Sequence, residues 1–483
     1  MTDIAFLPAR RLAGMIRRRK IGCLELLDHY LARVERFNPA LNAIIATDIP
    51  AARRRARAAD KAVASGDRWG PLHGVPMTVK ESFDVKGLPT TWGDPGHKDN
   101  IAAADALSVT RLRDAGAVVF GKTNVPIWLA DSQSFNANYG TTISPWNPER
   151  TPGGSSGGSA AALAAGLSAL EMGSDIAGSI RNPAAYCGLF GHKPTMGICP
   201  TLGHTLDGNV APLDMLVIGP LARSAADLAV SLSIIAGPDD IDSAGLRLAL
   251  PSARKKRLDE YRISILVDDE TVPTDREVCG LQQRLADFLR SSKVKVDIGA
   301  RPDFDAAESH RIYDILLRSG TSARQTDTEF ADNLAARNAL GPSDESKQAR
   351  RLRGLTLSHR DWLRLDEARH RIRWKWHEFF QKYDLMLTPI TVSAAFAHNT
   401  VLPYERSIPV DGAMQPFMNQ ISLPGYSNLA SLPTTIAPIG FTNENLPLGV
   451  QIIGPQYGDR SCIHFAGLLE KHYQGFVPPP GYA

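Results

Sequence analysis

Cysteine is scarce in this chain: five occur among 483 residues, and no two of them form a C-x-x-C pair. Cys23, Cys187, Cys199, Cys279 and Cys462 are widely scattered. Their odd number and spacing argue against a disulfide framework and give no sign of a cysteine-ligated zinc site. We therefore expect free thiols in a reducing compartment.

Long apolar runs are also missing. No stretch of about 18 apolar residues occurs, which is the length that a membrane-spanning helix requires. The segment 1–8 lacks the apolar centre of a signal peptide. These absences predict a cytoplasmic protein without a membrane partner.

Neither sign of charge is in excess. Lys and Arg number 54 against 51 Asp and Glu, for a net charge of +3, so bulk charge gives no reason to expect a nucleic-acid partner. The run Arg53, Arg54, Arg55 and Arg57 is interpreted as the solvated face of an Ala-rich helix. Hydrophobic residues make up 43% and charged residues 22%, which is typical of a globular protein.

Metal-binding patterns are absent as well. The 12 histidines form neither H-x-H nor H-E-x-x-H, so no metal ligand set is predicted. His370 and His377 are expected to pack or to lie at the surface. Ser292-x-x-Lys295 matches the S-x-x-K motif, but it opens an expected strand and is interpreted as chance.

Apolar periodicity predicts a protein with both helices and strands. Helices are expected over residues 8–37, with a break near Ile21-Gly22. A buried strand at 75–79 places Lys80 at its end, and a helix at 107–115 and a strand at 117–122 follow. The order strand, helix, strand predicts parallel pairing. Further strands are expected at 262–267, 294–298, 434–439 and 448–453, and further helices at 350–382 and 461–471.

The most unusual segment is Gly153–Ser159, with four glycines and three serines, followed by an Ala-rich helix at 160–166. Glycine permits close backbone approach, and a helix N-terminus offers free N–H groups to negative charge. A phosphate-binding P-loop is disfavoured because no Lys-Ser or Lys-Thr follows. A G-x-S-x-G nucleophile elbow is disfavoured because Arg150-Thr151-Pro152 is not a buried strand.

A third interpretation joins this segment to Lys80 and Ser179. The chain resembles the amidase signature family over most of its length, except roughly 240–400. The resemblance rests on several long motifs in the family's order: Gly74–Lys80, Gly121–Pro126, Gly153–Ser159, Ser174–Arg181, Cys187–Thr195 and Pro447–Pro455.

The resemblance implies an α/β fold with a large mixed, mostly parallel β-sheet, flanked by helices on both faces and carrying a helical insertion. No repeat or linker divides the chain, so residues 1–483 are expected to form a single domain. Its signature core is expected at about 65–235 and 383–475, and a helical, substrate-side region at about 240–382.

The resemblance also implies the chemistry: hydrolysis of a carboxylic amide by a Ser-Ser-Lys triad. Ser179 corresponds to the nucleophile, Ser155 to a serine that follows a cis peptide bond, and Lys80 to the base. A serine hydroxyl needs an adjacent base. A lysine of ordinary pKa, about 10.4, cannot serve at neutral pH, but burial lowers that pKa. Ser155 would relay the proton and later protonate the leaving amine.

The tetrahedral oxyanion is expected to meet the backbone N–H groups of Ile176, Ala177, Gly178 and Ser179. Position 177 is usually glycine in the family; alanine keeps the N–H but argues against a positive φ there. An acyl-enzyme on Ser179 is then hydrolysed by water, and neither a metal nor an organic cofactor is expected. Asp175 and Arg181 are expected to brace this loop, and His192 and Cys187 to pack in the core.

The acyl pocket is expected near Leu129, Ala130, Asp131 and Ser132, with Leu129 and Asp131 as substrate-binding residues, and along parts of 310–420. A bulky or aromatic small-molecule amide is the preferred substrate, and a homodimer is compatible with the sequence. Candidate aromatic walls are Trp128, Phe135, Tyr313, Trp362, Trp374, Trp376 and Phe417.

Two other functions stay open. One is the amidase subunit of a tRNA-dependent amidotransferase, which usually continues after Lys-Pro-Thr with Tyr-Gly-Arg; here Lys193-Pro194-Thr195 leads to Met-Gly-Ile-Cys, and the segment 182–186 resembles stand-alone bacterial amidases. The other is a non-catalytic binding module, which the presence of Lys80, Ser155 and Ser179 argues against. The acyl and amine groups, and cleavage of esters or carbamates, are left open.

Overall fold

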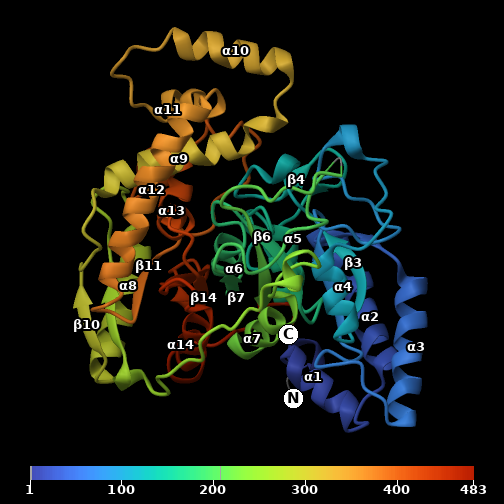
Figure 1. The fold of residues 1–483 in the computed structure, drawn as a ribbon. Coiled ribbons are helices and arrows are strands. Elements are labelled where there is room, and N and C mark those ends of the chain that lie inside the picture. Colours follow the sequence, from blue (N-terminus) through green and yellow to red (C-terminus); the bar gives the residue numbers. More distant parts are fainter. Residues whose placement is uncertain (1–2, 207) are drawn as a thin grey trace.

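An eight-stranded sheet forms the centre of the computed structural model, which describes residues 3–206 and 208–483 (Figure 1). The strand order is β10-β9-β11-β15-β14-β7-β8-β6. Along the chain these strands are β6 (Glu171–Asp175), β7 (Phe190–Lys193), β8 (Val217–Ala222), β9 (Arg262–Ile265), β10 (Lys295–Ile298), β11 (Leu385–Pro389), β14 (Thr434–Phe441) and β15 (Pro447–Ile453).

The sheet is mixed, as predicted, but its strands are not mostly parallel. Only the pairs β10/β9 and β9/β11 are parallel, whereas the other five neighbouring pairs are antiparallel. That part of the expectation, which came from the family resemblance, is wrong: the one strand-helix-strand unit read from the sequence lies in a separate small sheet. The connection 442–446 between β14 and β15 is too short for the crossover that parallel strands need.

Helices cover both faces of the sheet, and β14 shows how the sequence divides them. Successive strand residues point to opposite faces. Ala437 and Ile439 share a hydrophobic cluster with one group of helices, and Ile436 shares another cluster with a second group. The first group is α7 (Ala225–Ile235), α8 (Arg276–Ser291) and α14 (Asp459–His472); the second is α5 (Gly157–Ala164) and α6 (Arg181–Tyr186).

A smaller sheet lies beside the large one, with strand order β1-β3-β2. Strands β2 (Pro76–Lys80) and β3 (Val118–Thr123) are parallel, as their separation by a helix predicted, and β1 (Ile44–Thr47) is antiparallel to β3. The helices of this N-terminal part are α1 (Ala9–Arg17), α2 (Cys23–Leu41), α3 (Ile49–Ser65) and α4 (Leu107–Asp114).

Of the remaining helices, α10 lies at the top of Figure 1 above α11 and α9, and α12 and α13 lie below these on the left side. The helix predicted over 350–382 is two helices, because Ser358 begins the second one: its hydroxyl accepts a hydrogen bond from the Asp361 N–H at 3.1 Å. The helices are α9 (Ala306–Thr321), α10 (Asp327–Asn338), α11 (Lys347–Leu355), α12 (His359–Phe379) and α13 (Ser422–Leu429).

Several short elements complete the fold. Two hairpins pair β4 (Phe135–Asn136) with β5 (Gly140–Thr141), and β12 (Ser407–Val410) with β13 (Ala413–Pro416). The 3-10 helices are η1 (Ile4–Phe6), η2 (Pro95–His97), η3 (Ile127–Leu129), η4 (Asp242–Ala244), η5 (Leu258–Glu260), η6 (Ser322–Arg324) and η7 (Phe417–Ile421).

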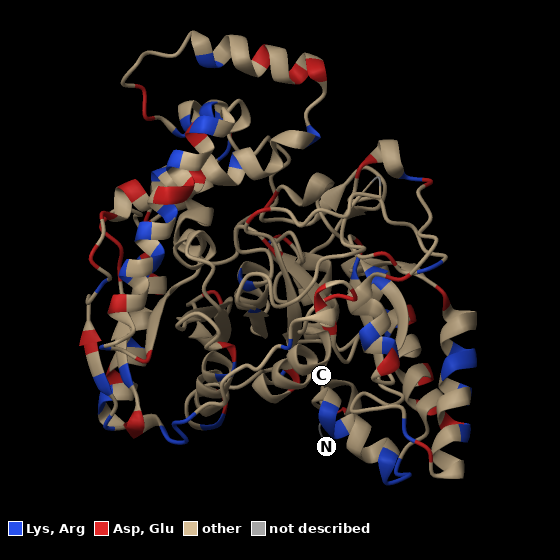
Figure 2. Ribbon diagram, in the orientation of Figure 1, with Lys and Arg blue, Asp and Glu red and all other residues tan. Residues whose placement is uncertain are grey.

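Charged residues concentrate on the outer helices, such as α3 and α12, and are sparse on the central strands (Figure 2). The run of arginines in α3 therefore lies on a helix at the edge of the molecule. Within the part of the chain that the structure describes, every helix is too short or too polar to cross a bilayer.

Candidate active site

Lys80 is the last residue of β2, and its side chain is completely buried. Its amine lies 2.7 Å from the Ser155 hydroxyl and 3.0 Å from the Ser174 hydroxyl. Ser174 belongs to β6 of the large sheet, so this contact joins the two sheets. The end of β2 thus holds the Lys80 amine between the hydroxyls of Ser155 and Ser174.

Burial lowers the pKa of the Lys80 amine to about 7, although the carboxylates of Asp175 and Glu81 act in the opposite direction. The charged form loses its hydration in the protein interior, and two hydroxyls do not replace it. A large fraction of the amine is therefore neutral near pH 7. A neutral amine has a free electron pair and can accept a proton.

Ser155 lies in the glycine-rich segment that leads into α5, and the Gly154–Ser155 peptide bond is cis. Two glycines are required here because other backbone atoms approach closely. A Cβ atom on Gly154 would lie 2.2 Å from the Gln133 carbonyl oxygen, and one on Gly158 would lie 2.3 Å from the Asn124 nitrogen. The segment is thus packed against the backbone on two sides.

Ser179 follows β6 and lines the same cavity as Ser155 and Ser174. Its residue is 8% exposed, whereas Ser155 is 1% exposed. Within the described residues, 3–206 and 208–483, no hydrogen bond joins the Ser179 hydroxyl to either Ser155 or Lys80. The structure therefore brings Lys80 and Ser155 into direct contact and places Ser179 at the wall of the cavity that Ser155 also lines.

The loop before Ser179 offers three backbone donors rather than four. Within the described chain, the N–H groups of Ile176, Ala177 and Ser179 have no acceptor. The N–H of Gly178 already donates to Asp175 Oδ1 at 2.8 Å, so its prediction as an oxyanion donor is corrected. The positive φ of this loop, 103°, falls at Gly178 and not at Ala177. This agrees with the expectation that alanine at position 177 disfavours a positive φ.

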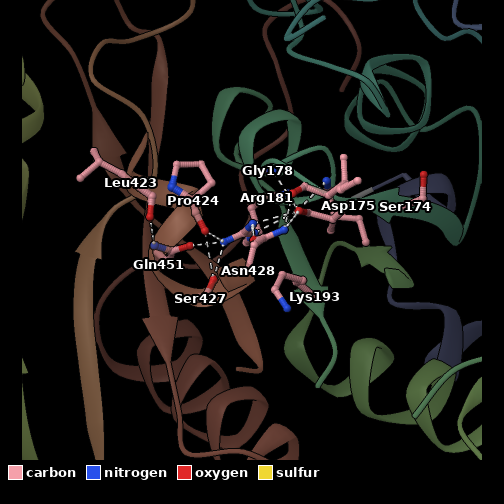
Figure 3. Close-up of polar contacts among 12 residues, drawn as sticks. Ser174, Asp175, Gly178, Arg181, Lys193, Leu423, Pro424, Ser427, Asn428 and Gln451 are labelled. Carbon is pink, nitrogen blue, oxygen red and sulfur yellow. Dashed lines mark hydrogen bonds and ion pairs between the residues drawn. The ribbon is translucent and has the colours of Figure 1, made fainter. Parts of the chain in front are cut away.

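Asp175 and Arg181 brace this loop, as predicted (Figure 3). Both side chains are fully buried, and the Arg181 guanidinium donates to both Asp175 oxygens at 2.9 Å. It continues to Ser427 Oγ at 2.8 Å and to the Asn428 and Gln451 side chains. Burial acts to raise the pKa of the Asp175 carboxyl, but the Arg181 charge outweighs it and holds that pKa below its usual range.

A sequence model of the family described as Amidase matches residues 25–463. The chain belongs to the amidase signature family. It is therefore a hydrolase that acts on amides.

Among relatives, an indoleacetamide hydrolase from Bradyrhizobium diazoefficiens is 31% identical over 466 residues, covering 95% of this chain and 85% of the relative. A glutamyl-tRNA(Gln) amidotransferase component from Roseiflexus castenholzii is 31% identical over 499 residues, covering 98% and 96%. A crystal structure described as an amidase has a TM-score of 0.78 at 26% identity, covering 97% of this chain and 100% of the other. Its α/β architecture matches the sheet and helices found here.

In this amidase signature protein, Leu129, Ala130, Asp131 and Ser132 line the cavity. The Asp131 carboxylate is occupied, because Arg406 donates to its two oxygens at 2.9 and 2.8 Å. Asp131 therefore fixes the cavity wall through an ion pair.

Of the aromatic residues considered from the sequence, Trp128 and Phe417 line the cavity, whereas Tyr313 and Trp376 are buried in the core and Trp374 is 66% exposed. Sequence reasoning missed Ser174, Trp92 and Arg324 as members of this site. Ser174 belongs to the motif Ser174–Arg181. Trp92 and Arg324 lie outside all the family motifs, and no sequence signal marks them.

The residues considered for other kinds of catalysis do not line this cavity. His192 is buried and is hydrogen-bonded to Thr435 and Asp459. Burial raises the pKa of the Cys187 thiol, which is the opposite of what a thiol nucleophile requires. Throughout residues 3–206 and 208–483, no three His, Cys, Asp or Glu side chains are grouped so as to hold a metal ion.

Arg181→Met is expected to destabilise the protein, because it leaves the Asp175 carboxylate buried without its partner. Removing one member of a buried ion pair typically lowers the free energy of unfolding by about 3–5 kcal/mol. The urea midpoint should fall clearly. As a control, Arg371→Met removes an exposed ion pair with Glu367 and should leave the midpoint unchanged. Equal midpoints for the two variants would contradict the bracing role.

Proposed function

We propose that the chain hydrolyses a carboxylic amide through an acyl-enzyme on Ser179, with Lys80 as the base and Ser155 as the proton relay. The observation that carries the proposal is the 2.7 Å contact between the buried Lys80 amine and the Ser155 hydroxyl, beside a cavity that Ser179 also lines. The lowered pKa of Lys80 supports it, because only the neutral amine accepts a proton.

The reaction begins when Ser179 gives its proton to Ser155, and Ser155 gives its own to Lys80. This requires the two hydroxyls to come within hydrogen-bond distance in the substrate complex, where catalytic hydrogen bonds commonly tighten. The Ser179 oxygen attacks the amide carbon, and the oxyanion meets the free N–H groups of Ile176, Ala177 and Ser179.

The tetrahedral intermediate then collapses with loss of the amine. Lys80 returns the proton through Ser155 to the leaving nitrogen, which would otherwise depart as an unstable anion. As water attacks the acyl carbon, it gives a proton through Ser155 to Lys80. When the C–O bond to Ser179 breaks, that proton returns through Ser155 to the Ser179 oxygen, and the carboxylic acid leaves. No step needs a metal ion or an organic cofactor.

An aromatic or bulky acyl or amine group suits the cavity, because Trp92, Trp128 and Phe417 line it together with apolar side chains. Aromatic walls favour aromatic ligands through stacking and edge contacts. The relative from Bradyrhizobium diazoefficiens, named an indoleacetamide hydrolase, supports an aromatic substrate.

A second candidate function is that of the amidase component of an amidotransferase, which the relative from Roseiflexus castenholzii favours because it covers nearly the whole chain. Such a component would act with partner chains on misacylated tRNA. The departure from the Tyr-Gly-Arg run after Thr195 disfavours it.

Assay of the purified chain alone distinguishes the two. We expect it to release ammonia from benzamide or phenylacetamide without any partner, and rapid quenching to trap the acyl group. Peptide mass spectrometry should then place the added acyl mass on the peptide that contains Ser179. Activity that appears only when amidotransferase partner chains and tRNA are added would favour the second function.

A further inference from the structure

Arg324 is held at the cavity by two tryptophans. Its guanidinium lies 4.8 Å from the ring centre of Trp92 and 6.0 Å from that of Trp128, and its Nη1 donates to the Trp128 carbonyl at 3.1 Å. All three residues line the cavity with Ser155 and Ser179. The guanidinium is therefore held over the two rings, and among the described residues its Nε and Nη2 donors have no acceptor.

The charge of Arg324 is not neutralised by the protein. Across residues 3–206 and 208–483, no carboxylate lies within ion-pair distance of Arg324 or of Arg318, the other arginine at the cavity. Asp131 is the one acidic residue in the described lining, and Arg406 occupies both of its oxygens. By contrast, Arg369 outside the cavity is paired with Asp214 at 2.9 Å. The cavity thus combines apolar walls with two uncompensated positive charges.

We propose that Arg324 is a specificity residue that selects amides whose apolar body carries a carboxylate. This inference rests on the proposed function and names the substrate class of that site. Arg324 is an exposed residue that also lines the cavity, so a carboxylate bound to it would lie nearer to solvent while the amide reaches the buried Ser179. A preoriented guanidinium binds a carboxylate through two parallel hydrogen bonds, which a neutral group of the same shape cannot match.

The experiment compares matched amides that differ in one group. One pair is 4-carbamoylbenzoate and 4-nitrobenzamide, with the group on the acyl side; the other is 4-acetamidobenzoate and 4-nitroacetanilide, with the group on the amine side. The nitro group has nearly the shape of a carboxylate without its charge. For each pair, the ratio of kcat/KM values is measured in the wild type and in Arg324→Met, so that intrinsic reactivity cancels between the proteins.

In Arg324→Met, the ratio for at least one pair should fall about tenfold, the effect of losing one charged hydrogen bond. Arg324→Lys should retain part of the preference. The control is Arg351→Met: Arg351 stacks on Tyr404 at 5.1 Å, as Arg318 does at 4.9 Å, but it does not line the cavity. This control should leave every ratio unchanged.

Binding of the two carboxylates to Ser179→Ala, measured by calorimetry with and without Arg324→Met, gives a readout that does not need turnover. If no amide is hydrolysed but carboxylate binding still depends on Arg324, the proposed function fails and the ligand class stands. If amides are hydrolysed and neither the ratios nor the binding respond to Arg324, the proposed function stands and this inference is overturned.

Discussion

Ser179→Ala is expected to reduce amide hydrolysis by about 10⁶-fold, the loss seen when a serine hydrolase loses its nucleophile. Without the Ser179 oxygen no acyl-enzyme forms, and the remaining groups can only polarise the amide. Folding should be unaffected, because within the described chain the Ser179 hydroxyl has no hydrogen-bond partner that the change would leave unsatisfied. Ammonia release and urea unfolding measure the two outcomes.

A matched control is Ser231→Ala. Ser231 is a buried serine of α7 whose hydroxyl donates to the Asp227 carbonyl at 2.9 Å, and it does not line the cavity. This variant should keep full activity. If Ser179→Ala retained turnover and still formed an acyl adduct, the nucleophile would be another residue.

The sequence predicts the site better than it predicts the sheet. Lys80, Ser155 and Ser179 each stand in a motif long enough to be specific; in the structure Ser155 and Ser179 line one cavity, and Lys80 contacts Ser155 from behind its wall. Trp92 and Arg324 could not be found in this way. They lie 232 positions apart and meet only because η6 lies against the segment that carries Trp92.

Among the strands, too, some are predicted from the sequence and others are not. The strands β14 and β15 are rich in apolar and β-branched residues and are predicted near their observed bounds. The strand β6, Glu171-Met-Gly-Ser-Asp, is buried but mostly polar, so no apolar pattern reveals it. Its Glu171 is hydrogen-bonded to Thr78 of β2, and such a partner is known only from the fold. Pairing direction is likewise set by contacts distant in the chain.

Lys80→Met is expected to lower kcat/KM by about 10² to 10⁴-fold, the usual contribution of a general base. In the wild type, kcat/KM should rise with pH through about 7, where the Lys80 amine loses its proton, and should be about tenfold below its plateau one pH unit lower. The variant should lose this dependence. Mere weakening of substrate affinity, with kcat and the pH profile unchanged, would argue that Lys80 binds substrate instead.

Stability separates this loss of activity from unfolding. Burial holds the Lys80 pKa at about 7 in the folded protein, below the value of 10.5 for a free lysine. The unfolded chain therefore binds more protons between these pH values, and the contribution of Lys80 to stability rises with pH across that window. At neutral pH and below, the buried amine costs stability, so Lys80→Met should not lower the urea midpoint.

The control for Lys80→Met is Lys193→Met. Burial also lowers the pKa of Lys193 to about 7, but this amine donates to the Pro194 carbonyl at 3.1 Å, and among the described residues no hydrogen bond joins it to Ser155. Lys193→Met should keep both the rate and the pH midpoint. If the midpoint near pH 7 persisted in Lys80→Met and disappeared in Lys193→Met, the titrating base would be Lys193, and the path from Lys80 through Ser155 to Ser179 would have to be abandoned.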